Sequence, residues 1–446
     1  MGSEMCIRDR CLGVVEKEVV KTVEVPGETV VVEKVIVEEV RAGYVTDPTT
    51  GRVVSAPAYG GTFNTAICYG ALADGPDTGS AGGAAVSSSV IEKLTIGDWA
   101  TDRDVYAFRT VSFTPEDAYT GSLAESWDIS PDGKTYTFNI REGVNWHDKA
   151  PMDGRELTAY DVEFNYHRIT GTGSGYTEPT PKQWLLPALS FESITATDKG
   201  TLVVKLNERY FGALVNLTDD AHTFMYPPEV IQEHGDVNDW SNLVGTGPYE
   251  FTNWVEGSSI TFAKNPNYWG YDEKYPENRL PYMDQLDVLV IIDPATRLAA
   301  IRTGKVDALF GSLGCSASLD DFDSLQRNNP EIVAWPYYQR SNYSFSLNVT
   351  EPPFDDIRVR HAMQMAIDHE AISNAFWKGY AYNTPQGLLS NKLTEWTTPF
   401  EEWPKELQGY YTYDPEGAEK LLDEACLLYT SPSPRDRTRS RMPSSA

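Results

Sequence analysis

The sequence is poor in basic residues and has no long apolar run. Its 446 residues include 37 Lys and Arg against 65 Asp and Glu, a net charge of −28. This imbalance argues against a nucleic-acid-binding protein, because phosphate contacts need clustered Lys and Arg. No stretch of eighteen apolar residues occurs, so no membrane-spanning helix is predicted. The 41% hydrophobic content is enough for folded cores, and the length predicts two or three domains.

Cysteine and histidine are also scarce. The five cysteines form no close pair and predict neither a disulfide framework nor a zinc knuckle. The six histidines lack the H-x-x-x-H and H-E-x-x-H spacings of zinc hydrolases. No G-x-S-x-G motif occurs, and residues 133–135 lack the upstream glycine of a P-loop. We therefore expect no catalytic residue, metal or cofactor, although the many carboxylates leave a glycosidase-like acid pair open.

Both ends of the chain resemble translated sequencing adapters. Residues 1–10, MGSEMCIRDR, and residues 426–446, which begin CLLYTSPSPRD, match adapter DNA when read as codons. The alternative is an unusual basic tail. On the adapter interpretation, residues 11–425 are a natural fragment that lacks both true termini. Any signal or lipobox is then lost, so the sequence does not decide whether Cys11 carries a lipid.

Residues 11–56 begin with a low-complexity stretch of Val, Glu and Lys. The alternation of valine with charged residues allows a strand or an extended chain, and Pro26-Gly27 interrupts any single helix. Residues 12–41 contain no aromatic side chain to anchor a core. We interpret residues 11–56 as a stalk, with a short coiled coil as the alternative.

The rest of the chain mixes hairpin and helix signals. A hairpin is predicted around residues 131–134, and another after residues 245–247. Residues 158–161 open a helix with a capping box, and Asp293-Pro294 supplies an N-cap with an N1 proline. Residues 356–378 are predicted to form one helix. This mixture, without a steady βαβ rhythm, indicates an α/β protein of several lobes.

Nine short motifs follow one another along residues 57–425. They are LAESW (123–127), SPDGKTYTF (130–138), REGVNWHD (141–148), TAYDV (158–162), GTGPY (245–249), NPNYWG (265–270), RTGKVD (302–307), PFDDIRVR (353–360, after Asn348) and YDPEGA (413–418). In this order they closely resemble the family 5 extracytoplasmic solute-binding proteins, the dipeptide, oligopeptide and nickel receptors of ABC importers. Each motif alone is weak evidence for this family, whereas nine motifs in the family's order are strong evidence.

The resemblance implies an α/β fold of the periplasmic-binding-protein type II kind, with three lobes and an interlobe cleft. Lobe I would comprise residues 57–95 and 211–305, lobe II residues 96–210, and lobe III residues 306–425, with its C-terminal part missing. A truncated lobe III would leave apolar surface uncovered, so we expect poor solubility of this chain.

The resemblance also implies where a solute would bind. Cleft walls are expected in residues 69–89, 310–314 and 343–347, although packing or linker roles are equally expected there. The ligand-cleft candidates are Tyr69, Asp77, Thr78, Ser80, Phe310, Gly311, Ser312, Tyr343 and Phe345. We interpret Trp146, His147, Asp148 and Trp269 as structural. The aspartate that grips a peptide amino terminus in peptide-binding members is expected beyond residue 425.

The implied function is a non-catalytic receptor that hands a small solute to an ABC-transporter permease. Peptides are expected first, oligosaccharides second, and nickel or a nickel chelate third. A secreted hydrolase and a structural surface protein are the alternatives from other classes. We expect a monomer outside the cytoplasm, in the periplasm or on the outer face of the cytoplasmic membrane, tethered by a lipid or by the stalk. We expect no nucleic acid as a partner. We expect contact with the membrane only through an N-terminal anchor that this sequence has lost.

Overall fold

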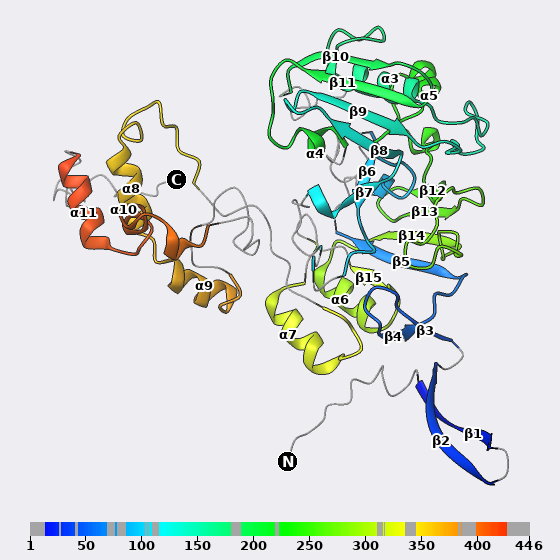
Figure 1. Ribbon diagram of the computed structural model, residues 1–446. Helices are drawn as coiled ribbons and strands as arrows, with labels where there is room; N and C mark the ends of the chain where they lie inside the picture. Colours follow the sequence, from blue (N-terminus) through cyan, green and yellow to red (C-terminus); the bar gives the residue numbers. More distant parts are fainter. Residues whose placement is uncertain are drawn as a thin grey trace, which may run out of the picture. The chain divides into compact units, whose positions relative to one another are not determined.

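The computed structural model of the chain divides into two compact units (Figure 1). The first comprises residues 1–107 and 114–317, and the second residues 108–113 and 318–446. The structure describes the backbone of 14–25 and 28–40, and residues 43–68, 76–77, 86–102, 105–106, 108, 116–179, 189–218, 223–309, 315, 317–334, 345–381, 385 and 398–425.

The N-terminal low-complexity stretch forms a two-stranded antiparallel hairpin. Strand β1 (Val14–Val25) pairs with β2 (Glu28–Val40), with Val14 opposite Val40. Of the strand and the extended chain that the alternation allowed, the backbone forms the strand, and it is not the helix that the coiled-coil alternative requires. A second small hairpin follows, made of β3 (Tyr44–Thr46) and β4 (Val53–Ser55). The stalk role of these residues stays a prediction.

A four-stranded antiparallel sheet forms one part of the first unit (Figure 1). Its order is β10 (Phe191–Ala196), β11 (Thr201–Leu206), β9 (Thr135–Ile140) and β8 (Ala124–Ile129). Strands β8 and β9 are the predicted hairpin, because the backbone reverses between them at residues 130–134. Every second residue of β9 is buried, as expected for a strand with one face on a core.

Helix α3 (Ala159–Thr170) lies against this sheet. Its start is the predicted capping box, since the Asp161 carboxylate accepts a hydrogen bond from the Thr158 N–H at 2.8 Å. Arg155 then joins Asp161 to Glu229 of α5 (Pro228–His234) through contacts of 2.7 Å each. Short elements complete this region: β6 (Thr95–Gly97), η2 (Glu116–Ala118), β7 (Tyr119–Gly121), α4 (Ala213–Thr218) and η4 (Trp240–Asn242).

A five-stranded mixed sheet forms the other part of the first unit. Its order is β12 (Tyr249–Val255), β13 (Ser259–Lys264), β14 (Gln285–Val290), β5 (Thr62–Ile67) and β15 (Ala308–Leu309). Strands β14, β5 and β15 run parallel, and α6 (Pro294–Arg302) connects β14 to β15. The Asp293 cap of α6 is confirmed, because its carboxylate accepts from the Thr296 N–H at 2.7 Å.

Two features of the first unit bear on the predicted lobes. One continuous apolar core includes Phe138 and Val204 of the four-stranded sheet together with Ile260 and Phe262 of the five-stranded sheet. Strand β15 follows residue 306, where the sequence predicted lobe III to begin, yet it pairs with β5. The first unit therefore continues to residue 317.

Three of the nine motifs meet at the carbonyl of Gly247. The ring Nε2 of His147, from REGVNWHD, lies 3.0 Å from this oxygen, and the Asn265 amide of NPNYWG also donates to it at 3.0 Å. The Gly245 N–H lies 3.3 Å from His147 Nδ1. Since Nδ1 accepts here, Nε2 carries the proton. The Gly247 carbonyl thus joins the three turns, through the buried His147 imidazole on one side and the Asn265 amide on the other.

A single carboxylate, that of Glu92, joins two of these motifs. It accepts hydrogen bonds from the Thr246 hydroxyl at 2.8 Å, the Tyr268 hydroxyl at 2.8 Å and the Trp269 indole at 3.0 Å. Loss of water raises the pKa of Glu92, while these hydrogen bonds and the nearby Arg141 charge oppose the rise. Arg141 also lies over the Trp269 ring, 4.7 Å from its centroid.

The second unit is mainly helical in its described part. Its helices are α7 (Leu319–Asn328), α8 (Ile357–Met365), α9 (His369–Trp377), η5 (Phe400–Glu402), α10 (Lys405–Tyr410) and α11 (Pro415–Glu424). Ala362 and Met365 of α8 pack with Ala418 of α11 in a small core.

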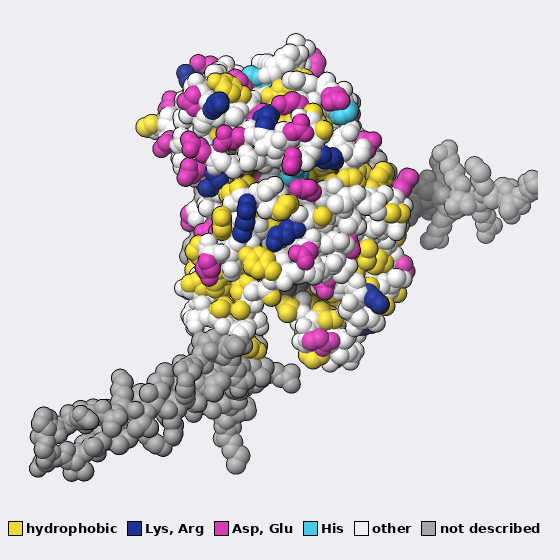
Figure 2. Space-filling model, turned by 90° about the vertical axis from the view of Figure 1, so that its right-hand side faces the viewer, with side chains coloured by type: hydrophobic (Ala, Val, Ile, Leu, Met, Phe, Trp, Pro, Cys, Tyr) yellow, Lys and Arg dark blue, Asp and Glu magenta, His cyan; other side chains and the backbone are white. Residues whose placement is uncertain are grey.

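The prediction of one helix over residues 356–378 is wrong, because the chain forms α8 and α9 there. The Asp368 carboxylate accepts from the Ala371 N–H at 2.8 Å and starts a new helix. No described helix is long and apolar enough to cross a membrane. On the face drawn in Figure 2, Asp and Glu side chains are scattered widely with Lys and Arg between them.

We predict that Gly245→Ala destabilises the first unit by more than ~3 kcal/mol. A Cβ at this position would lie 1.9 Å from the Val90 carbonyl oxygen, which is backbone and has no free rotation. Gly409→Ala in α10 is the control, because nothing lies within 4 Å of its added Cβ. Urea unfolding would measure both. Equal midpoints for the two variants would contradict the prediction.

We also predict that His147 makes stability pH-dependent. Burial lowers the pKa of His147 to about 4, below the ordinary value of 6.5. The neutral form is therefore favoured in the folded state. Its stabilisation is complete above pH 6.5 and is lost as the pH falls toward 4, by about 3 kcal/mol in total. Urea unfolding between these pH values should show a shallower loss in His147→Gln, and identical slopes would refute the assignment.

Candidate functional site

The carboxyl ends of β14, β5 and β15 lie at one edge of the five-stranded sheet, because these strands are parallel. In open α/β sheets, ligands bind in the crevice outside the carboxyl ends of parallel strands. This edge, formed by residues 67–68, 290–292 and 309, is called the carboxyl edge below. It is the part of the first unit where a solute site is expected.

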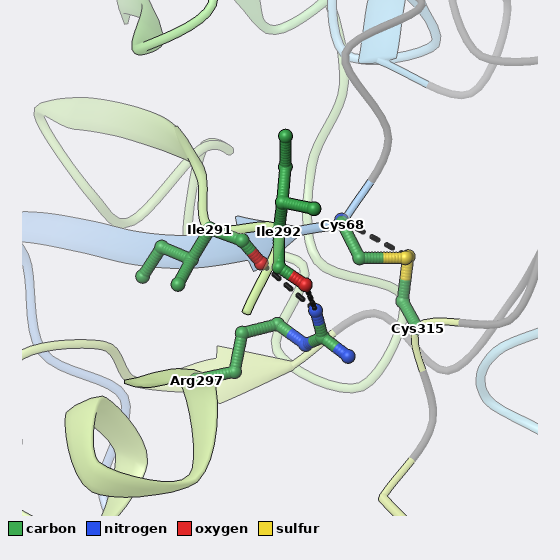
Figure 3. The surroundings of a disulfide bond; sticks show 5 residues. All are labelled: Cys68, Ile291, Ile292, Arg297 and Cys315. Atoms are coloured by element: carbon green, nitrogen blue, oxygen red, sulfur yellow. Dashed lines mark hydrogen bonds between the residues drawn. A yellow bond between two sulfur atoms is a disulfide. The ribbon is translucent and has the colours of Figure 1, made fainter. Parts of the chain in front are cut away.

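A disulfide bond between Cys68 and Cys315 closes the carboxyl edge (Figure 3). Cys68 directly follows β5, and Cys315 is separated from it by 247 residues in sequence. The Cys68 N–H also lies 3.0 Å from Cys315 Sγ. The expectation of no disulfide framework from cysteine spacing missed this pair. The reason is that two parallel strands, β5 and β15, bring together segments that are far apart in the sequence.

Arg297 fixes the backbone that follows β14. Its guanidinium points at the carbonyls of Ile291 and Ile292 (Figure 3), to which Nη1 donates at 2.9 and 2.7 Å. The residue is only 5% exposed, so these hydrogen bonds satisfy a buried charge. The Ile292 residue is 66% exposed at the same edge. The edge therefore combines a held backbone with an accessible apolar side chain.

Asp307, in the RTGKVD motif, aligns the start of β15 with β5. Its carboxylate accepts from the Asn64 N–H at 2.8 Å, and its own N–H donates to the Asn64 carbonyl at 2.7 Å. These bonds determine where β15 ends relative to β5.

Only two of the nine predicted cleft residues, Asp77 and Phe345, lie within the described part of the chain. Phe345 belongs to the second unit and is 75% exposed. The other candidates, Tyr69, Thr78, Ser80, Phe310, Gly311, Ser312 and Tyr343, lie outside the described residues. In chain order, Tyr69 follows Cys68 and Phe310 follows the last residue of β15, so both come next after the carboxyl edge.

Asp77 lies in the interior of the first unit and is only 3% exposed. Its carboxylate pairs with Arg168 of α3 at 2.6 Å, and the Arg168 side chain is equally inaccessible. A buried carboxylate with this partner holds α3 to the segment before β6. Solute contact by Asp77 stays a prediction.

The motif residues interpreted as structural occupy different environments. Trp146 and His147 are buried, which confirms their structural interpretation. Trp269 is half-buried and hydrogen-bonded to Glu92, whereas Asp148 is exposed. Sequence reasoning missed Glu92 and Arg297, since neither stands in a motif. Within the described residues, no group of three or more His, Cys, Asp or Glu side chains is placed to hold a metal ion.

The chain belongs to the bacterial extracellular solute-binding proteins, family 5. The model of this family, described as its middle region, matches residues 118–432. Members of this family are binding proteins and not enzymes. The fold is that of type II periplasmic binding proteins, as the resemblance implied.

Individual relatives are similar over part of their length. Heme-binding protein A of Haemophilus influenzae is 29% identical over 315 residues, which are 68% of this chain and 53% of that protein. Glutathione-binding protein GsiB of Salmonella typhi is 29% identical over 308 residues, 68% of this chain and 52% of that protein. The chain thus spans about half the length of the curated relatives it matches.

Among solved structures, the periplasmic binding protein DppA of Helicobacter pylori in complex with the peptide STSA matches with a TM-score of 0.61. Its sequence identity is 24%, and the match covers 83% of this chain and 67% of DppA. This likeness shows the fold alone.

We predict that Asp77→Asn destabilises the first unit by about 3–5 kcal/mol, because it leaves the buried Arg168 guanidinium without a counter-charge. Asp128→Asn on the exposed side of β8 is the matched control and should change stability by less than ~0.5 kcal/mol. Chemical unfolding measures both. A cost for Asp77→Asn as small as that of the control would favour the solute-contact prediction instead.

Proposed function

We propose that this chain is the receptor part of an ABC importer, which binds a small solute between lobes and delivers it to a membrane permease. The carboxyl edge carries the proposal. It presents an exposed apolar side chain and a disulfide at the place where parallel sheets bind ligands, and from there the chain continues into the second unit. The three lobes predicted from the sequence and the nine cleft candidates remain part of this proposal.

Peptides are the first solute class. GsiB is named for glutathione, which is a tripeptide, and DppA was solved with the peptide STSA. The described residues contain no metal-binding cluster that would favour free nickel. Oligosaccharides remain the second class. Heme, named for a relative of similar identity, is a further member of the titration panel.

The proposed location is outside the cytoplasm. The Cys68–Cys315 disulfide supports it, because such bonds persist in oxidising compartments and are rare in the reducing cytosol. Tethering through a lipid or through the N-terminal hairpin, and a monomeric state, are proposed on the resemblance alone.

Isothermal titration against peptide, oligosaccharide and heme panels tests the function. If the natural reading frame is longer than this chain, the protein titrated is the product of that longer frame. We expect a peptide to bind without turnover, as judged by mass spectrometry of the solute. Ile292→Asp at the carboxyl edge should weaken binding at least tenfold, since it places a charge on an apolar contact surface.

Val255→Asp is the matched control, because Val255 is also exposed but ends β12. It should leave binding unchanged. Turnover of the solute would refute the receptor function, and binding of oligosaccharides without peptides would replace the solute class. Equal binding by both variants would remove the site from the carboxyl edge.

A further inference from the structure

The first unit contains a polar groove that shares no residue with the carboxyl edge. Two hollows of about 970 and 450 Å³ adjoin there, because Gly143 and Trp269 line both of them. The first runs along the end of β9 and the turn between β10 and β11, residues 198–201. The second runs along residues 145–154 and the NPNYWG segment.

The aromatic side chain shared by both hollows has a fixed orientation. The Trp269 indole N–H donates to Glu92 at 3.0 Å, and the Arg141 guanidinium lies over the ring. Arg141 is itself held by the Ser122 carbonyl, which accepts from its Nε at 2.9 Å. The groove is thus organised around a preset aromatic ring and cation, which reduces the entropy cost of binding.

Four exposed polar side chains of the groove have no protein partner among the described residues. These side chains line the groove and make no hydrogen bond or ion pair with the described residues. They are Glu142, Asn145, Asp153 and Asn267. The backbone is accessible as well, since a Cβ added to Gly143 would meet nothing within 4 Å. The groove therefore offers amide and carboxylate groups that a ligand can pair with.

The composition of the groove selects among ligand classes. Acidic residues outnumber basic residues in the lining, which disfavours an anionic ligand. The acidic residues are Glu125, Glu142, Asp148, Asp153 and Asp198, and the basic residues are Arg141, Lys199 and Arg279. Apart from the tryptophans and Ile140 the lining is polar, which disfavours a lipid. Sugar hydroxyls both donate and accept hydrogen bonds, so they suit the amide and carboxylate groups of the lining.

We propose that this groove binds a neutral sugar chain. The site is formed by the first unit alone, so it goes beyond solute delivery and does not depend on it. Free oligosaccharides and insoluble neutral glycans share this chemistry, and the test distinguishes the two sources.

The test titrates the purified chain with cellohexaose, maltohexaose and chitohexaose, and pulls it down with insoluble cellulose and chitin. We expect at least one hexasaccharide to bind. Glu142→Ala combined with Asn145→Ala should weaken that binding about tenfold, as expected from the loss of two polar contacts. Both side chains are exposed and make no hydrogen bond with the described residues, so the fold should be retained, as judged by circular dichroism.

The matched control is Glu256→Ala combined with Asn253→Ala, at exposed positions on and beside β12. It removes the same side-chain types outside the groove and should bind like the parent. Binding only to the soluble chains identifies a free oligosaccharide, and pull-down by cellulose or chitin identifies an insoluble glycan.

Failure of all three hexasaccharides to bind at millimolar concentration, together with no pull-down, would overturn the proposal. So would equal binding by the groove variant and its control. Displacement of a bound hexasaccharide by a peptide solute would assign the sugar to the solute site and would also overturn it. A peptide titration that fails leaves this test unaffected, so the two proposals fail separately.

Discussion

The hydrogen bonds that converge on the Glu92 carboxylate are the constraint on which much of the first unit depends. Thr246, Tyr268 and Trp269 reach it from two separate turns. Beside it, the Gly247 carbonyl accepts from Asn265 and from the His147 imidazole. These bonds hold together the loops that connect the two sheets, whose apolar side chains share one core. Several motifs that mark the family are therefore parts of one polar junction, and their primary role here is to hold the fold together.

The first unit carries two surfaces with different chemistry. The groove around Trp269 is polar and has more acidic than basic residues. The hydrogen bond to Glu92 fixes the orientation of the Trp269 ring. The carboxyl edge depends on other constraints, namely Arg297, Asp307 and the disulfide, and presents an apolar side chain. Because each surface has its own supporting residues, substitutions at one are expected to leave the other intact.

Local signals in the sequence were sufficient to predict many helices and strands, but they were not sufficient to predict the residues of the candidate site. Three features that depend on a few neighbouring residues were all predicted. They are the hairpin at residues 130–134, the capping box at Thr158 and the Asp293 cap. The break between α8 and α9 was missed, because the Asp368 cap competes with a continuous apolar pattern. Asp77 was chosen from its loop, whereas its partner Arg168 comes from a distant helix. Glu92 is one of many acidic residues in an acidic chain, and only the fold distinguishes it.

The disulfide also sets an order of events during synthesis. Cys68 and Cys315 are separated by 247 residues, so at roughly 5–20 residues per second Cys315 is made roughly 12–50 s after Cys68. Strand β5 spends most of this interval without β14 and β15, its two neighbours in the sheet, because both lie far downstream in the sequence. A strand with both edges unpaired is prone to pair wrongly with other chains. The carboxyl edge is therefore one of the last parts of the first unit to assemble, and the thiol of Cys68 must remain unreacted until then.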